Sequence, residues 1–248
     1  MKKPIFIPFP RTKTVRKAAW MAVALAAVMF PAMSRGQAGT PAPSPTHKPA
    51  KLIYHPPILA DRSLGERMGG GARGAGGTDA SLLTLVPEHV ALTTKEQPSL
   101  FWFQSKPARA KLELTLIEPG KPKPLLALGS PAEKPGIHRI RLTNHGVKLA
   151  PDVGYKWTVS LVPDPANRSL DTVASGMVKR IQPTKELTQA LAAASVADRP
   201  AIYAQAGIWY DALEAISDEI DAKPSDPSLQ QERADLLKQV GLPAMKKD

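Results

Sequence analysis

Histidine and acidic side chains are the residues of this chain best suited to chemistry, and the histidines lack the spacing of a common zinc site. The chain has no cysteine and five histidines, which are His47, His55, His89, His138 and His145. A zinc hydrolase typically carries two histidines four residues apart on one helix, with a glutamate beside the first. No pair of histidines here has that spacing. We interpret His138, on the expected inward face of a strand, as a hydrogen-bonded core residue.

Three other catalytic patterns are incomplete. Gly69, Gly71 and Gly74 match the Gly-x-Gly-x-x-Gly pattern of dinucleotide sites, but that pattern follows a strand and opens a helix. Here a proline-rich stretch precedes the glycines, and a strand is expected after them. Ser175 lacks the Gly-x-Ser-x-Gly turn of α/β-hydrolases. A glycosidase needs two carboxylates that flank a cleft, whereas acidic pairs here are plentiful only in the C-terminal part of the chain.

These patterns predict no catalytic, cofactor-binding or metal-ligating residue. We therefore expect a protein that is not an enzyme and that uses no cofactor. A deep polar cleft around His138 or His145 would favour the opposite hypothesis, an enzyme.

The segment 164–171 is the most distinctive loop of the sequence. It joins the last two expected strands, and loops at the ends of a sandwich often carry binding residues. The alternative, which we favour, is an Asx-type turn in which Arg168 pairs with Asp164 or Asp171.

A strand over residues 154–161 is the segment around which we expect the fold to form. Its large apolar residues take every second position, the pattern of a strand with one dry face. They are Tyr155, Trp157, Val159 and Leu161. The lead-in Leu-x-Pro-x-x-x-Tyr is similar to the tyrosine corner of immunoglobulin-like sandwiches. We expect this strand to be central in its sheet, with the Tyr155 hydroxyl bonded to backbone near Leu149 or Pro151.

Short apolar segments separated by turn residues recur through residues 81–182. They number about seven, and lie at 82–86, 100–103, 111–117, 125–128, 136–142, 154–161 and 172–181. The pattern predicts an immunoglobulin- or fibronectin-like antiparallel β-sandwich, a mainly β fold to which helices are added. The segment 125–128 lies beside a proline, as an edge strand would. The cations Lys111, Arg139 and Arg141 are expected on an outer, basic face.

About three helices are expected over residues 183–242. Thr184, Asp198 and Asp226 are the expected N-caps, and the second helix continues from Asp198 until Pro224 stops it. The pair of helices around residues 204–241 is similar to a tetratricopeptide hairpin, which cannot bury both of its faces alone. We expect its apolar stripe around Trp209 to dock on the sandwich.

The second helix also carries an acidic face. Its members are Asp211, Glu214, Asp218 and Asp221. We favour a solvated face; the alternative is a dock for a basic surface, either of the chain's own sandwich or of another protein.

The N-terminal region has the pattern of an export signal. Residues 1–38 hold seven cations and no acid, and the apolar run 18–32 is shorter than the roughly 20 residues of a spanning helix. Small residues Gly36 and Ala38 favour cleavage near Ala38; the alternative is an uncleaved membrane anchor. Residues 39–80 are expected to form a disordered linker rich in Pro and Gly that buries little.

Net charge gives little indication of a nucleic-acid partner. The formal charge is +11, but without the seven N-terminal cations the chain has 26 cations against 22 acids. An excess of four is too small for a DNA or RNA footprint. We expect a periplasmic or extracellular protein, with contact to a membrane only through an uncleaved signal segment.

Several short motifs, in this order and spacing, resemble the bacterial DUF928 family, which is common in cyanobacteria. The motifs are Leu-Val-Pro-Glu at 85–88, Ser-Leu-Phe-Trp-Phe at 99–103, Pro-Gly-Ile at 135–137, Gly-Tyr-Lys-Trp at 154–157, Ser-Leu-Val-Pro-Asp-Pro at 160–165, Arg-Ser at 168–169 and Ala-Gln-Ala-Gly-Ile-Trp-Tyr-Asp-Ala-Leu at 204–213. The resemblance covers residues 65–241 and implies an exported protein of uncharacterised function. Relatives often carry cysteines where this chain has Thr78 or a neighbour, and Pro163, so any disulfide formed there is absent here. The resemblance supplies no catalytic residue.

Two functions remain open from the sequence. The first is an exported, non-enzymatic envelope protein that acts as a protein-interaction module, with another envelope or secreted protein as its partner. The alternative is a binding module for envelope polysaccharide or anionic lipid, through the basic face of Lys111, Arg139 and Arg141.

Overall fold

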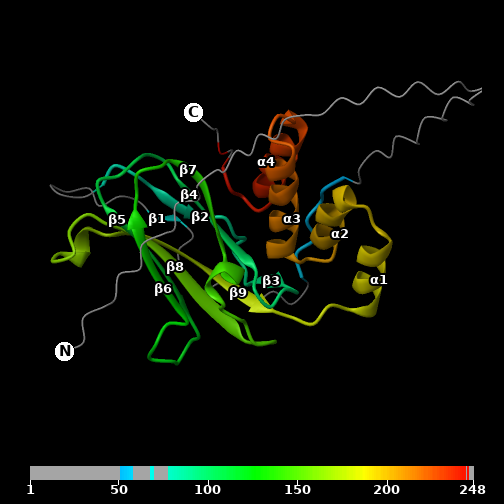
Figure 1. Cartoon of the computed structure of the whole chain (residues 1–248), viewed down its shortest axis with the longest axis horizontal. Coiled ribbons are helices and arrows are strands. Elements are labelled where there is room, and N and C mark those ends of the chain that lie inside the picture. The colour runs from blue at the N-terminus through cyan, green and yellow to red at the C-terminus, as the bar shows by residue number, and fades with distance from the viewer. Residues whose placement is uncertain (1–50, 58–67, 70–77, 244, 246–248) are drawn as a thin grey trace, which may run out of the picture. The chain divides into compact units, whose positions relative to one another are not determined.

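The computed structural model describes residues 51–57, 68–69, 78–243 and 245. The predicted signal peptide, the rest of the expected linker and most of the glycine-rich run lie outside the described residues. In the part that is described, two β-sheets are followed by four α-helices (Figure 1). None of these helices combines the length and the apolar composition that a bilayer-spanning helix needs.

The larger sheet has five strands in the order β3-β9-β8-β5-β6. Their bounds are β3 Ala91–Thr93, β5 Lys111–Ile117, β6 Leu126–Pro131, β8 Gly154–Val162 and β9 Thr172–Arg180. The predicted central position of the strand after Tyr155 is confirmed, since β8 is the middle strand and its alternate residues from Tyr155 to Leu161 are buried. The edge position predicted for residues 125–128 is also confirmed, since β6 ends the sheet.

The smaller sheet has four antiparallel strands in the order β1-β2-β4-β7. Their bounds are β1 Met68–Gly69, β2 Leu82–Thr84, β4 Ser99–Gln104 and β7 Gly136–Arg141. The two sheets share one hydrophobic core. At Gly176 of β9, an added Cβ would lie 3.0 Å from Nε1 of Trp157 on the paired strand β8 and 3.1 Å from Cγ2 of Val86, which follows β2 of the smaller sheet. A bare backbone at this position therefore lets the Trp157 ring fill the space between the sheets.

The strand β3 departs from the predicted antiparallel arrangement. It pairs parallel with β9, with Ala91 opposite Val178 and Thr93 opposite Arg180. The sequence did not predict β3 or β1, because strands of three and two residues are too short to show a period of two. The expectation of a wholly antiparallel arrangement is therefore wrong at this edge.

Four α-helices follow β9, where about three were expected. Their bounds are α1 Lys185–Ala193, α2 Arg199–Gln205, α3 Trp209–Ala222 and α4 Pro227–Gln239. Short 3-10 segments lie at Leu142–His145, Arg168–Leu170 and Val196–Asp198. Thr184 and Asp226 cap α1 and α4 as predicted, by accepting hydrogen bonds from the backbone N–H of Leu187 and Ser228.

The prediction of one continuous helix from Asp198 to Pro224 is wrong. The chain breaks between α2 and α3 at Gly207, which has a left-handed φ of 75° that side chains other than glycine rarely adopt. Asp198 makes no capping bond to the backbone of α2 and instead accepts a hydrogen bond from the Ser195 hydroxyl. The sequence does not reveal this break, because the apolar residues before and after Gly207 follow one helical period although they belong to two helices.

The first turn of α3 inserts into the core that the two sheets share. Trp209 donates from Nε1 to the Leu85 carbonyl at 2.8 Å, and the neighbouring Tyr210 accepts from Nε1 of Trp157 at 2.8 Å. The Tyr210 hydroxyl in turn donates to the Met177 carbonyl at 2.9 Å. Burial raises the pKa of Tyr210, so the hydroxyl stays protonated as this donation requires. The predicted docking of the Trp209 stripe on the β-sheets is confirmed.

The tyrosine at the start of β8 ties that strand to the preceding loop. The backbone N–H of Ala150 donates to the Tyr155 hydroxyl oxygen at 3.1 Å, between the two positions predicted for this contact. Tyr155 is almost completely buried.

We predict that Tyr155→Phe lowers the free energy of unfolding by about 1 kcal/mol, because the ring is kept and one hydrogen bond is lost. Urea unfolding followed by tryptophan fluorescence measures the change. The matched control is Tyr203→Phe, since the Tyr203 hydroxyl has no hydrogen bond within the described part of the chain. Equal stabilities for the two variants would contradict the assignment.

Candidate functional site

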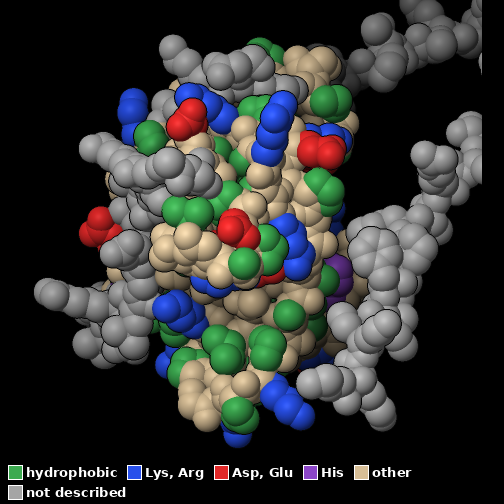
Figure 2. All heavy atoms as spheres, turned by 90° about the vertical axis from the view of Figure 1, so that its left-hand side faces the viewer, with side chains coloured by type: hydrophobic (Ala, Val, Ile, Leu, Met, Phe, Trp, Pro, Cys, Tyr) green, Lys and Arg blue, Asp and Glu red, His purple; other side chains and the backbone are tan. Residues whose placement is uncertain are grey.

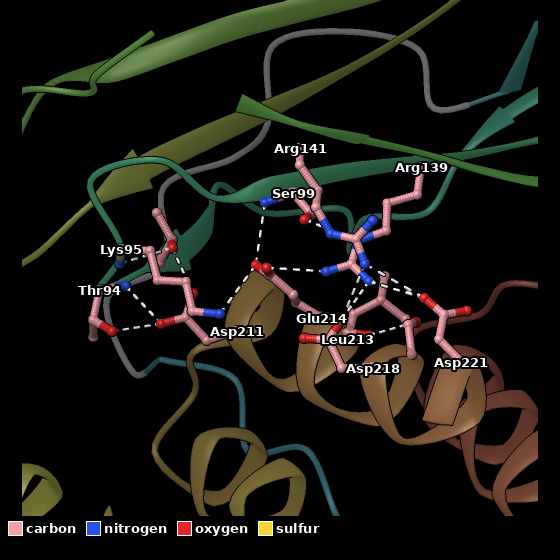
Figure 3. Close-up of polar contacts among 12 residues, drawn as sticks. Thr94, Lys95, Ser99, Arg139, Arg141, Asp211, Leu213, Glu214, Asp218 and Asp221 are labelled. Carbon is pink, nitrogen blue, oxygen red and sulfur yellow. Dashed lines mark hydrogen bonds and ion pairs between the residues drawn. The ribbon is translucent and has the colours of Figure 1, made fainter. Parts of the chain in front are cut away.

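A charged cluster joins β7 to α3 and is the largest group of ionisable residues in the described part of the chain. We call it the charged junction, and it consists of Lys95, Arg139, Arg141, Glu214, Asp218 and Asp221 (Figure 3). It has three cations and three acids, so its formal charges balance.

Arg139 is the centre of the charged junction. Its guanidinium lies 3.0 Å from Glu214 and 2.6 Å from Asp218, and its Nε donates to the Ser99 hydroxyl at 2.9 Å. The same group lies 5.2 Å from the ring centre of Phe101, within the range of a cation–π contact. The side chain is only 11% exposed, so these contacts are largely removed from water.

The remaining members extend the cluster towards solvent on one side and towards β4 on the other. Arg141 lies 3.3 Å from Asp218 and 3.4 Å from Asp221, and all three are exposed. At the inner end, Glu214 also pairs with Lys95 at 3.2 Å and accepts from the backbone N–H of Ser99 at 3.2 Å.

Asp211 lies one turn before Glu214 and is completely buried. Its carboxylate accepts hydrogen bonds from the hydroxyls of Thr93 and Thr94 and from the backbone N–H of Thr94. Burial raises the pKa of Asp211, while these hydrogen bonds and the charge of Lys95 oppose the rise. The carboxylate therefore acts as an acceptor that holds the end of β3 against α3.

The acidic face of the predicted second helix is solvated only at its outer end, at Asp218 and Asp221. Asp211 and Glu214 are buried, and Asp218 and Asp221 pair with arginines of the chain's own β7. The alternative interpretation, a dock for the chain's own basic surface, is the one that the structure bears out. Helical spacing places these four acids on one face, but only the position of β7 supplies their partners.

The predicted basic face does not exist as one surface. Lys111 belongs to β5 of the larger sheet and pairs with Glu113 at 2.8 Å, whereas Arg139 and Arg141 belong to β7 of the smaller sheet. Figure 2 shows a face on which basic side chains are scattered among acidic and hydrophobic ones. The three cations therefore do not combine into a platform for an anionic ligand.

The histidines singled out in the sequence do not converge. His138 is half-buried, stacks on Trp102 with ring centres 5.2 Å apart, and donates from Nε2 to the Lys134 carbonyl at 2.9 Å. Burial lowers the pKa of His138. His145 is exposed at the end of a 3-10 turn. Among the described residues, no group of three or more His, Asp or Glu side chains could hold a metal ion.

The loop 164–171 has the local structure that we favoured. Asp164 accepts from the backbone N–H of Ala166 at 2.9 Å, as in an Asx turn, and Arg168 pairs with Asp171 at 2.7 Å. Arg168 also reaches Glu113 of β5 at 2.9 Å. The loop's charges therefore hold its own conformation.

A second site lies on the helices and was not predicted. Residues 51–57, which we call the strap, lie against α2, α3 and α4, with Leu52 and Tyr54 buried and Ile53 37% exposed. This alternation is that of an extended chain with one side on a surface. The expectation that the linker buries little is wrong for this part of it.

Gln239, the last residue of α4, holds the backbone of the strap. Its Oε1 accepts from the N–H of Tyr54 at 2.8 Å, and its Nε2 donates to the carbonyl of Leu52 at 3.0 Å. One side-chain amide thus satisfies the donor and the acceptor that an extended segment presents on one edge.

Tyr54 is the anchor of the strap. Its ring packs edge-on against Trp209, with ring centres 5.0 Å apart, and its hydroxyl lies 3.2 Å from Nε2 of His89. Nδ1 of His89 lies 3.0 Å from the Val90 carbonyl, which can only accept, so Nδ1 is the donor there and Nε2 is the ring nitrogen that faces the Tyr54 hydroxyl. Burial raises the pKa of Tyr54, which keeps its hydroxyl a donor.

The break between α2 and α3 makes room for the strap. The N–H of His55 donates to the carbonyl of Ala204 at 3.0 Å. A Cβ at Gly207 would lie 2.9 Å from the His55 carbonyl oxygen and 3.3 Å from the ring of Pro57. Position 207 therefore requires glycine for two reasons: its φ is left-handed, and a side chain there would collide with the strap.

A family comparison covers the sheets and helices described above. The model of the family described as Domain of Unknown Function (DUF928) matches residues 68–248. The chain belongs to the DUF928 family. The resemblance noted in the sequence is thus confirmed, and no curated protein matches this DUF928 chain. The strap lies before the first matched residue, although it is buried on helices that belong to the DUF928 region.

We predict that Arg139→Ala destabilises the protein by about 2 kcal/mol, because the buried carboxylate of Glu214 loses a charged hydrogen-bond partner and keeps only Lys95. Urea unfolding measures the loss. The control is Lys121→Ala at an exposed pair with Glu118, where the change should stay within about 0.5 kcal/mol. A loss for Arg139→Ala no larger than that of the control would show that the charged junction does not hold the helices.

We predict that the stabilising effect of Asp218 depends on pH. Partial burial opposes its ionisation, but hydrogen bonds and charges from Arg139 and Arg141 outweigh burial and lower the pKa of Asp218. A lowered carboxyl pKa contributes stability that is present above the unfolded pKa of about 3.9 and is lost as the pH falls through the folded pKa.

Asp218→Asn should therefore be less stable than the wild type by about 0.5–1 kcal/mol at pH 7, the range of an exposed pair. The difference should shrink as the pH falls below about 4. Urea titrations at a series of pH values test this, with the exposed Asp79→Asn as the control. A difference that stays constant down to pH 2 would contradict the prediction.

Proposed function

We propose that this DUF928 chain is an exported, non-enzymatic protein-interaction module of the cell envelope. Its binding surface is the helical unit, α2 to α4, carried on the β-sheets. The observation that carries this proposal is the strap, since the helical unit holds residues 51–57 as an extended peptide by contacts from Gln239, Ala204 and Trp209.

The charged junction supports a binding role over a catalytic one. Its arginines on β7 pair with its acids on α3. These ion pairs hold the helical unit in place on the sheets. A surface fixed in this way is preorganised, and preorganisation lowers the entropic cost of binding a partner.

We also propose the export route and the sheet architecture that were expected from the sequence. Residues 1–38 act as a signal peptide cleaved near Ala38, which delivers the chain to the periplasm or the exterior. Residues 81–182 form an immunoglobulin-like sandwich, a proposal supported by the corner contact of Tyr155 and by the central position of β8. Residues 183–242 are the helical addition.

The test is site-specific photo-crosslinking in cells that make the full-length protein. A benzophenone amino acid replaces Lys238, an exposed residue of α4 beside the strap. The matched control replaces Val173, 42% exposed on β9.

We expect one envelope or secreted protein to be captured repeatedly from position 238 and not from position 173, as identified by mass spectrometry. Capture of the same proteins from both positions, or of none from position 238, would contradict the proposed function.

A further inference from the structure

We propose that the groove holding the strap recognises an extended segment of another polypeptide that carries an aliphatic residue two positions before a tyrosine. Residues 51–57 occupy this groove in cis and so limit access to it. This inference rests on the proposed function, because it names the chemistry of the partner that the helical unit would bind.

Backbone contacts define the extended conformation of the bound segment. Gln239 pairs with the carbonyl of Leu52 and the N–H of Tyr54, and the Ala204 carbonyl accepts from the N–H of His55. These three contacts do not depend on the side chains of the segment, so any extended peptide could make them. They therefore supply affinity rather than selectivity.

Side-chain contacts define the aliphatic-x-tyrosine spacing. In an extended chain, residues two positions apart point to the same side, and here Leu52 and Tyr54 are both buried while Ile53 between them is exposed. Tyr54 is selected over other aromatic residues by its hydroxyl contact to His89, in addition to its edge-on contact with Trp209.

A cavity lies beside the strap, along α4. This cavity of about 540 Å³ borders Lys51, Leu52 and Ile53 and is lined on the helix side by charged residues and Gln239. Glu232, Asp235 and Lys238 are those charged residues. A partner segment bound in place of the strap would lie beside these charged residues.

The strap competes with such a partner because it belongs to the same chain. A tethered segment acts at an effective concentration on the order of millimolar, so a free peptide with equal contacts displaces it only at comparable concentrations. Removing the anchoring side chains in cis should therefore expose the groove.

The experiment measures binding of a fluorescein-labelled peptide with the sequence of residues 48–57 to the full-length chain by fluorescence anisotropy. The emptied variant carries Leu52→Ala and Tyr54→Ala, and circular dichroism establishes that it is folded. We expect the emptied variant to bind the peptide at least about tenfold more tightly than the wild type does.

Three comparisons test the chemistry of recognition in the emptied variant. Gln239→Glu keeps the acceptor for the peptide N–H but replaces the donor, and should weaken binding about tenfold; Gln230→Glu, with the same charge change on the same helix, should not. In the peptide, replacing the tyrosine by phenylalanine should weaken binding about fivefold. Replacing the isoleucine between the two anchors by alanine should leave binding unchanged.

A second measurement on the wild type keeps the inference testable if the emptied variant is unstable. Hydrogen exchange at the N–H groups of Tyr54 and His55 should accelerate with millimolar peptide and remain slow with a peptide whose tyrosine is alanine. Unchanged exchange, or binding of a folded emptied variant that ignores the tyrosine and Gln239, would overturn the inference.

Size-exclusion chromatography separates a foreign partner from a second copy. A wild-type dimer that disappears in the emptied variant would overturn the inference in favour of strap exchange between copies. If the peptide binds as expected while crosslinking at position 238 captures no partner, the groove chemistry holds and the proposed function fails. The reverse result would retain the proposed function and reject the aliphatic-x-tyrosine specificity.

Discussion

The insertion of Trp209 and Tyr210 into the core between the sheets is the interaction on which the rest of the structure depends. Tyr210 accepts from Trp157 of the central strand β8 and donates to the backbone of β9, while Trp209 donates to the backbone just after β2. The first turn of α3 is thus bonded to strands β8 and β9 of the larger sheet and to the residue that follows β2 of the smaller one. Because these polar groups are buried, each one would be costly without its partner. The helices and sheets therefore share one core.

The orientation of α3 makes its acidic face a structural surface. Once its first turn is anchored, Asp211 meets Thr93 and Thr94, and Glu214 and Asp218 meet Arg139. The guanidinium of Arg139 is a fork that can pair with two carboxylates and still donate to Ser99. The charged junction therefore holds α3 against β7 and β4.

The same anchoring creates the surface that we assign to binding. Trp209 is completely buried in the core, and its ring lies nearly perpendicular to that of Tyr54 of the strap. The left-handed turn at Gly207 brings the end of α2 close enough for a backbone bond to the strap. The groove is therefore a consequence of how α2, α3 and α4 meet.

Local patterns in the sequence determined the longer strands, two of the three expected caps and the family of this protein. The alternation from Tyr155 to Leu161 requires one buried face wherever the strand lies, and Thr184 and Asp226 cap helices through neighbours two or three residues away. Only the tertiary structure decided the partners of distant groups. Arg139 and Asp218 lie 79 residues apart, and Tyr54 and Gln239 lie 185 apart. No local period encodes such pairs, because they form only when the docking of α3 brings separate elements together.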